Sequence, residues 1–184
     1  MKRLKLKPEQ IIVPGEYKLG NESILKIYFR IFDSGCGDCL PPIVVMNKNV
    51  RIPFYKLESS FENYIRYNNY LREFLNENSN VEYFLLDGNH KSVAATLSHT
   101  PISVLELQED LDIENCKRLV RRGELFNWTI PGNSLDGIAE ELGDYLYHSG
   151  HCEKEFQTVS DRVQKLTSNG DLPKYMKERY LRKD

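Results

Sequence analysis

The chain has 184 residues, of which 40% are hydrophobic and 28% are charged, and this composition fits one globular domain with a core of its own. Its formal net charge of −2 argues against a general attraction to nucleic acid or to an anionic membrane surface. No apolar run approaches the roughly 20 residues of a membrane-spanning helix. The basic start MKRLKLKPEQ lacks the apolar segment of a signal peptide. We therefore expect a cytoplasmic protein without a membrane partner, whose cysteines are thiols.

The first 110 residues alternate between strand-like and helix-like segments. Short β-branched or apolar runs such as IIVP (11–14) and PIVVM (42–46) indicate strands. Apolar residues that recur every three or four positions, as in ESILKIYFRIF (22–32), indicate helices. The expected strands are 11–14, 42–46, 81–86 and 102–107. The expected helices between them are 22–32, 59–75 and 89–98. Such alternation is typical of the α/β fold class.

The remainder of the chain has helical patterns only. Apolar residues at helical spacing mark three further helices at 113–120, 135–146 and 156–166. We therefore expect an α/β core of short strands and helices over 1–110, with a helical insertion near 56–78, and a C-terminal helical extension over 111–184 that packs on the core. The helix at 59–75 begins with the capping-box spacing of Ser59 and Glu62.

The turn DGNHK (87–91), between an expected strand and an expected helix, is the most informative stretch of the sequence. The free N–H groups and the dipole at a helix start attract anions, and Gly88 permits close approach of the backbone. His90 and Lys91 add two donors at an exposed helix start, so the turn predicts an anion site, most naturally for phosphate. Asp87 fits this site as the ligand of a divalent cation that bridges phosphates, or as a helix cap. The alternative is ordinary turn chemistry with solvated side chains.

Three segments resemble motifs of the ParB/sulfiredoxin-like superfamily. LPPIVVM (40–46) resembles the family's PPIVV strand, FLLDGNHKSVAA (84–95) resembles its DG-x-H-R-x-x-A segment, and TPISVLEL (100–107) resembles the IPV strand that follows. The motifs occur in the family's order and cover about residues 10 to 107, which leaves the C-terminal part outside. The resemblance implies a ParB/sulfiredoxin-like fold. It also implies a nucleotide whose phosphates bind at the turn, as in partition proteins, sulfiredoxin and small-molecule kinases.

Two departures from the family narrow the expected activity. Sulfiredoxin places its reactive cysteine immediately before the histidine, where this chain has Asn89, so sulfiredoxin activity is not expected. The family's arginine is Lys91 here, which meets a phosphate as a point charge and lacks the bidentate fork of arginine.

The resemblance to the kinase-type members implies phosphoryl transfer from a nucleotide, ATP or ADP with Mg²⁺, to a small-molecule acceptor. We expect Asp87 to hold the metal ion. The expected nucleotide-binding residues are Asp87, Gly88, Asn89, His90, Lys91 and Ser92. The expected catalytic residues are Glu22, Asp87 and His90, with Glu22 as the base on the acceptor hydroxyl and Glu16 as second candidate for that role. Glu22 has an alternative explanation, because acidic residues are favoured in the first turn of any helix.

Cys36 and Cys39 form a Cys-x-x-Cys pair, which is half of a zinc site. The other half would come from His148, His151 and Cys152. The favoured alternative is two free thiols in a loop.

A second partner class is suggested by CKRLVRRGELFNW (116–128). Its basic residues beside aromatic ones are a possible nucleic-acid contact through Lys117, Arg118, Arg121 and Arg122, with Phe126 and Trp128 nearby. The alternative is a solvated helix face. The open alternatives to a kinase are thus a nucleic-acid-associated or regulatory module that uses the pocket as a nucleotide switch, and an interaction domain with a vestigial pocket.

Overall fold

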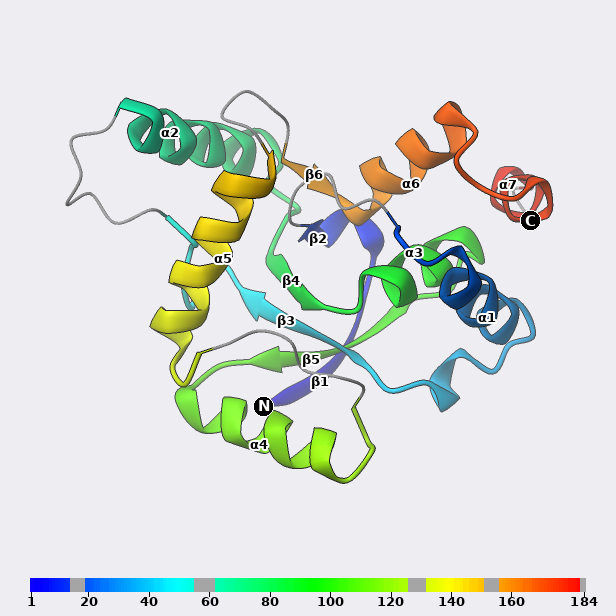
Figure 1. Ribbon diagram of the computed structural model, residues 1–184, viewed down its shortest axis with the longest axis horizontal. Coiled ribbons are helices and arrows are strands. Elements are labelled where there is room, and N and C mark those ends of the chain that lie inside the picture. Colours follow the sequence, from blue (N-terminus) through cyan, green and yellow to red (C-terminus); the bar gives the residue numbers. More distant parts are fainter. Residues whose placement is uncertain (14–18, 55–61, 126–131, 151–155, 183–184) are drawn as a thin grey trace.

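A mixed β-sheet crosses the middle of the molecule, with helices on both of its faces (Figure 1). The computed structural model describes residues 1–13, 19–54, 62–125, 132–150 and 156–182. In this part of the chain six strands lie in the order β1-β5-β3-β4-β2-β6. Their bounds are β1 Lys2–Leu6, β2 Ile11–Val13, β3 Ile43–Asn47, β4 Tyr83–Asp87, β5 Ile102–Leu107 and β6 Gln157–Thr158.

The sheet mixes both kinds of pairing. β2 pairs with β4, and β3 with β5, in parallel, while the β1–β5, β3–β4 and β2–β6 pairs are antiparallel. The register of β3 against β4 shifts between Val44 and Val45, where Val44 lies opposite Asp87. This irregularity falls at the end of β4, next to the turn that the sequence singles out.

Alternating residues of the strands divide the interior into two apolar clusters. Odd-numbered residues of β4 such as Leu85 belong to one cluster, and even-numbered ones such as Phe84 belong to the other. The same alternation holds in β3, where Val45 and Met46 are on opposite sides. Because both faces of the sheet are buried, these strands are continuously apolar, as in other sheets covered by helices on both sides.

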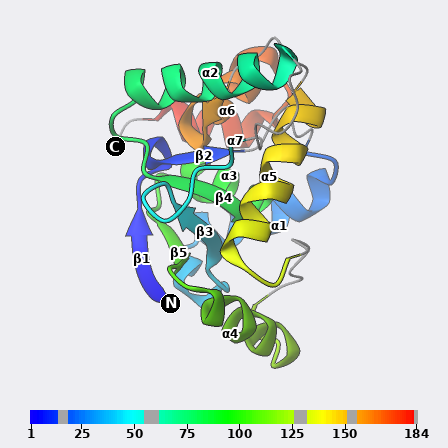
Figure 2. The same cartoon turned by 90° about the vertical axis from the view of Figure 1, so that its left-hand side faces the viewer.

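The helices form the two outer layers. Residues of α1, α3, α6 and α7 belong to the cluster of Leu85, and residues of α2, α4 and α5 belong to the cluster of Phe84. In Figure 2, α5 passes in front of the sheet, with α2 above it and α4 below it. The α-helices are α1 Glu22–Asp33, α2 Glu62–Glu77, α3 Asn89–Leu97, α4 Asp110–Arg121, α5 Leu135–Gly150, α6 Val159–Asn169 and α7 Lys174–Leu181. The described residues also include the short 3₁₀ turns η1 Pro8–Gln10 and η2 Gly37–Cys39.

The α/β class expected from the sequence is confirmed, and each expected strand and helix has a counterpart within a few residues. The strand expected at 81–86 begins later and extends to Asp87. The expected cap Ser59 lies outside the described residues, and Glu62 is the first residue of α2. Three observed elements, β1, β6 and α7, were not expected from the sequence.

The C-terminal part is more than a set of helices. β6 adds a strand to the edge of the sheet beside β2, with Ile12 opposite Thr158. Val159 and Val163 of α6 and Met176 of α7 belong to the same apolar cluster as Leu85. Residues after 110 therefore help to build the central core. No helix in the described part of the chain is long and apolar enough to cross a membrane.

Truncation of Leu85 to alanine should destabilise the protein by about 2–5 kcal/mol, because the side chain is 1% exposed and its removal leaves a cavity. The matched control is Ile27→Ala on the outer face of α1, where the side chain is 57% exposed, and its effect should stay within about 0.5 kcal/mol. Urea denaturation measures both. Equal stability of the Leu85→Ala variant and the unchanged protein would contradict the placement of β4 in the core.

Candidate functional site

The turn that joins β4 to α3 takes its shape from Gly88. This residue has φ 107° and ψ 31°, in the left-handed region that residues with a Cβ rarely adopt. A Cβ at this position would lie 2.3 Å from Cγ2 of Ile43 at the start of β3. Both the backbone conformation and the space therefore require glycine. The result is a strand that passes into a helix through a single residue.

The start of α3 leaves helix N–H groups without a side-chain cap, because its N-cap is Gly88. The first backbone bond of the helix runs from the N–H of Ser92 to the carbonyl of Gly88 at 2.9 Å. The N–H groups of Asn89, His90 and Lys91 precede this bond, at the positive end of the helix dipole. The Ser92 hydroxyl is buried and donates to the carbonyl of Asn89 at 2.9 Å, so it serves the first turn of the helix.

Lys91 is not at an exposed position, which corrects the expectation from the sequence. Its side chain is 4% exposed, and Nζ donates to the carbonyl oxygens of Pro41 at 3.0 Å and Pro42 at 3.2 Å. Burial lowers the pKa of Lys91, and the charge of Asp87 acts in the opposite direction. The ammonium thus joins α3 to the segment that leads into β3, in addition to placing positive charge under the turn.

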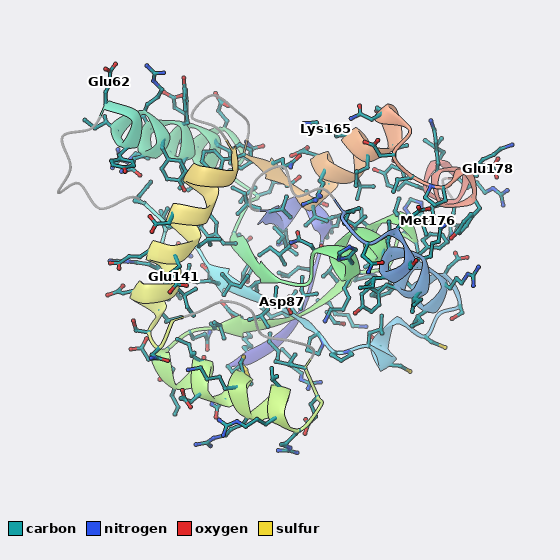
Figure 3. All side chains as sticks on the ribbon, viewed as in Figure 1. Glu62, Asp87, Glu141, Lys165, Met176 and Glu178 are labelled. Carbon is teal, nitrogen blue, oxygen red and sulfur yellow. The ribbon has the colours of Figure 1, made fainter. Side chains whose placement is uncertain are left out.

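Asp87 is the partly buried last residue of β4, and lies near the middle of the molecule (Figure 3). Burial raises its pKa, while the charge of Lys91 and the N–H of Gly88 lower it. The carboxylate also acts on Tyr28 of α1, whose pKa is raised by burial and then by the charge of Asp87. A carboxyl group with a raised pKa at the end of a strand is suited to accept a proton from a substrate.

His90 and Arg162 interact electrostatically at the first turn of α3. The Arg162 side chain is 3% exposed, and its Nη1 lies 3.4 Å from Oδ1 of Asn89. Burial lowers the pKa of His90, and the positive charge of Arg162 lowers it further. Nε2 of His90 is buried and has no hydrogen-bond partner among the described residues. The half-buried imidazole is therefore neutral at neutral pH, with one ring nitrogen buried and unsatisfied within the described residues.

Arg162 is the residue of this site that the sequence analysis missed. It comes from α6, whose start is held by a capping box in which Thr158 accepts from the N–H of Asp161 and Asp161 accepts from the N–H of Thr158. One signal could have found it. Arg162 falls between Val159 and Val163 on the apolar stripe of the helix. A charged side chain on the core-facing stripe of a helix is unusual and therefore marks a candidate functional residue.

Glu22 lies in the first turn of α1, where its exposed carboxylate pairs with Lys26 at 2.7 Å. The residue of α1 that interacts electrostatically with Asp87 is Tyr28, six residues or about 9 Å further along the helix axis. The contacts of Glu22 are thus those of a first-turn acid in a surface ion pair. Its alternate Glu16 lies outside the described residues.

The structure brings no zinc ligand set together in the part that it describes. There, no group of three or more His, Cys, Asp or Glu residues is arranged to hold a metal ion. Cys36 and Cys39 are exposed free thiols. His151, Cys152 and the side chain of His148 lie outside the described residues. Within that part of the chain, Asp87 therefore does not belong to a metal-binding group of three or more such residues.

The basic residues of α4 and of its C-cap, Arg122, interact with neighbouring groups of the same chain. Lys117 pairs with Glu114 at 3.0 Å and donates to Asn133 at 2.7 Å, and Arg122 pairs with Glu124 at 2.6 Å. Nε of Arg121 donates to the carbonyl of Lys117, and Arg118 is exposed. Phe126 and Trp128 lie outside the described residues. These contacts match a solvated helix face.

Compared with protein-family models, with curated proteins and with solved structures, the chain has no match. The fold and the turn together define an α/β protein with a cationic, partly buried helix start. The ParB/sulfiredoxin-like assignment, which rests on three short motifs in the first 107 residues, stays a prediction.

Replacement of Gly88 by alanine should destabilise the protein by about 1–3 kcal/mol from the clash with Ile43, in addition to the cost of a left-handed backbone. Gly170→Ala is the matched control, because Gly170 has φ 77° and a Cβ there would meet nothing within 4 Å. Thermal melting should therefore rank Gly88→Ala below Gly170→Ala. Equal melting temperatures would show that β3 does not lie against the turn.

Proposed function

We propose that this protein binds a nucleotide, ATP or ADP, by its phosphates at the start of α3 and transfers a phosphoryl group to a small-molecule acceptor. The observation that carries the proposal is the buried guanidinium of Arg162, 3.4 Å from Asn89, at the start of a helix whose N-cap has no side chain. Arginine is the side chain best matched to phosphate geometry, and a helix start is a natural anion site.

The charges around the turn support a phosphate better than a neutral ligand. Arg162 and Lys91 place two buried positive groups at this end of α3, and Nε2 of His90 is an additional donor or acceptor. Such groups are worth more at a partly buried site than in water, because the effective dielectric constant is lower there. The resemblance to the superfamily supports a nucleotide as the source of the phosphate, since its members typically bind nucleotide phosphates at this turn.

The proposed transfer needs a group that accepts a proton. A bond forms between the acceptor oxygen and the terminal phosphorus, the bond from that phosphorus to the bridging oxygen breaks, and the hydroxyl proton moves to a base. Asp87 is the better candidate than Glu22 for the base, since burial raises the pKa of Asp87 and Glu22 is held in a surface ion pair. Arg162 and His90 would stabilise the charge on the phosphoryl oxygens.

A magnesium ion at this site would be held by Asp87 together with ligands from the nucleotide. Mg²⁺ in nucleotide sites is commonly held by one or two carboxylates, phosphate oxygens and water, so the single carboxylate of Asp87 is sufficient. When bound, the ion would neutralise charge on the phosphates. A carboxylate that holds the ion is a weaker base, so the two roles of Asp87 compete. Magnesium dependence of turnover, measured in the unchanged protein and in Asp87→Asn, separates these two roles.

Arg162→Met should weaken nucleotide binding by roughly ten- to hundredfold, which corresponds to about 1.5–3 kcal/mol for one charge-assisted contact. Calorimetric titration with ATP and with ADP measures the affinity, and circular dichroism verifies the fold. Arg179→Met is the control, since Arg179 pairs with Asp33 at the surface, and it should bind as the unchanged protein does. Arg162→Lys keeps the charge and should recover part of the affinity. The proposal fails if the unchanged protein binds neither nucleotide at millimolar concentration.

Nucleotide affinity should rise as the pH falls through and below 6.5, the ordinary pKa of histidine, because a bound phosphate favours the protonated form of His90. In the free protein the pKa of His90 is lowered, so the proton is taken up on binding. Each unit by which binding raises this pKa corresponds to about a tenfold gain in affinity at low pH. His90→Gln is the control. The phosphate itself also titrates, with a pKa of about 6, and this contribution to the pH dependence of the affinity is the same in both proteins. Subtracting the pH profile of the variant from that of the unchanged protein therefore leaves the contribution of His90. Parallel pH profiles would exclude His90 from the site.

A further inference from the structure

The loop between α1 and β3 carries two exposed thiols, Cys36 and Cys39, in a single turn. We propose that these two cysteines form a redox-active dithiol that exchanges with small disulfides of the glutathione type and closes to an intramolecular disulfide. The proposal does not depend on the phosphate site.

The backbone of the turn places the two side chains on one side. Cys36 is the N-cap of the 3₁₀ turn η2, and the N–H of Cys39 donates to the carbonyl of Cys36 at 3.0 Å. In a 3₁₀ turn, side chains three positions apart eclipse each other, and a rise of about 2 Å per residue separates their Cα atoms by about 6 Å. Disulfides join Cα atoms about 4.4–6.8 Å apart. The thiols can therefore pair without a large movement of the backbone.

The turn is also held firmly on both sides. The N–H of Cys36 donates to the carbonyl of Ile31 at the end of α1, at 3.0 Å. Gly37 packs on the ring of Phe32 so closely that a Cβ would lie 2.4 Å from a ring carbon. Beyond the turn, the carbonyls of Pro41 and Pro42 accept from Lys91. A turn fixed in this way loses little conformational entropy when the disulfide closes.

Exposure separates this pair from Cys116. Cys36 and Cys39 are open to solvent, whereas Cys116 is 0% exposed and burial raises the pKa of its thiol to about 11. Exchange requires a thiolate that a small disulfide can reach. The structure thus assigns the reaction to the exposed pair and leaves Cys116 as an internal control.

The exchange proceeds in two balanced steps. The thiolate of one cysteine attacks a sulfur of the small disulfide, forms a mixed disulfide and releases one small thiolate. The thiolate of the other cysteine then attacks the cysteine sulfur of the mixed disulfide and releases the second small thiolate. The net reaction turns two protein thiols and one small disulfide into one protein disulfide and two small thiols. The small disulfide is reduced by two electrons and receives the two protons.

The test equilibrates the Cys152→Ser protein with defined mixtures of reduced and oxidised glutathione. Cys152 is removed because it lies outside the described residues. After alkylation under denaturing conditions, mass spectrometry should find a peptide with Cys36 joined to Cys39, lacking two hydrogen atoms, while Cys116 stays alkylated. The variants Cys36→Ser and Cys39→Ser, in the same background, should stop at the mixed disulfide with glutathione.

A spacing variant tests the geometry. One glycine inserted between Gly37 and Asp38 keeps both thiols exposed but removes their three-residue spacing, so the midpoint of oxidation should move to a more oxidising glutathione ratio. The proposal is overturned if the pair stays as thiols in mixtures that oxidise a thioredoxin-type dithiol. It is equally overturned if glutathione accumulates on both cysteines without ring closure, or if the spacing variant has an unchanged midpoint.

Discussion

The close approach of β3 to the turn at Gly88 is the constraint on which the candidate site depends. Ile43 occupies the space where a side chain at position 88 would be, and the left-handed backbone there allows β4 to pass into α3 through one residue. The N-cap of α3 consequently has no side chain that could satisfy the first N–H groups. The same close packing brings Lys91 within reach of the carbonyls of Pro41 and Pro42. The uncapped helix start and the buried charge of Lys91 thus both result from the packing of β3 against the turn.

Burial controls the charge states of the turn. It lowers the pKa of Lys91 and raises the pKa of Asp87, and each of these two groups opposes the shift of the other. His90 has its pKa lowered by burial and by Arg162, so it contributes a neutral ring while Arg162 contributes the permanent charge. This division of roles is suited to an anionic ligand, because the guanidinium attracts it at any physiological pH and the imidazole responds to its arrival.

The C-terminal part of the chain contributes to the site through β6 and α6. β6 pairs with β2, which lies parallel to β4, and the capping box of Thr158 and Asp161 starts α6 directly after it. Arg162 is consequently carried to the start of α3 from a position 73 residues away in the chain. The boundary expected near residue 110 therefore does not divide the structure, because the residues on both sides of it contribute to the core and to the candidate site.

The sequence by itself determined the α/β class, a strand directly before the turn at Asp87, the glycine turn and the helix that begins at Asn89. These features are local, because they follow from apolar periodicity and from the conformations that glycine allows. The alternation of apolar residues at Leu4 and Leu6 was too short to indicate β1. β6 has only two residues, which is too few for any pattern. Only the tertiary structure decided that Lys91 is buried and that Arg162 joins His90. Burial and long-range contacts depend on which elements pack together, and no local pattern of residues specifies that packing.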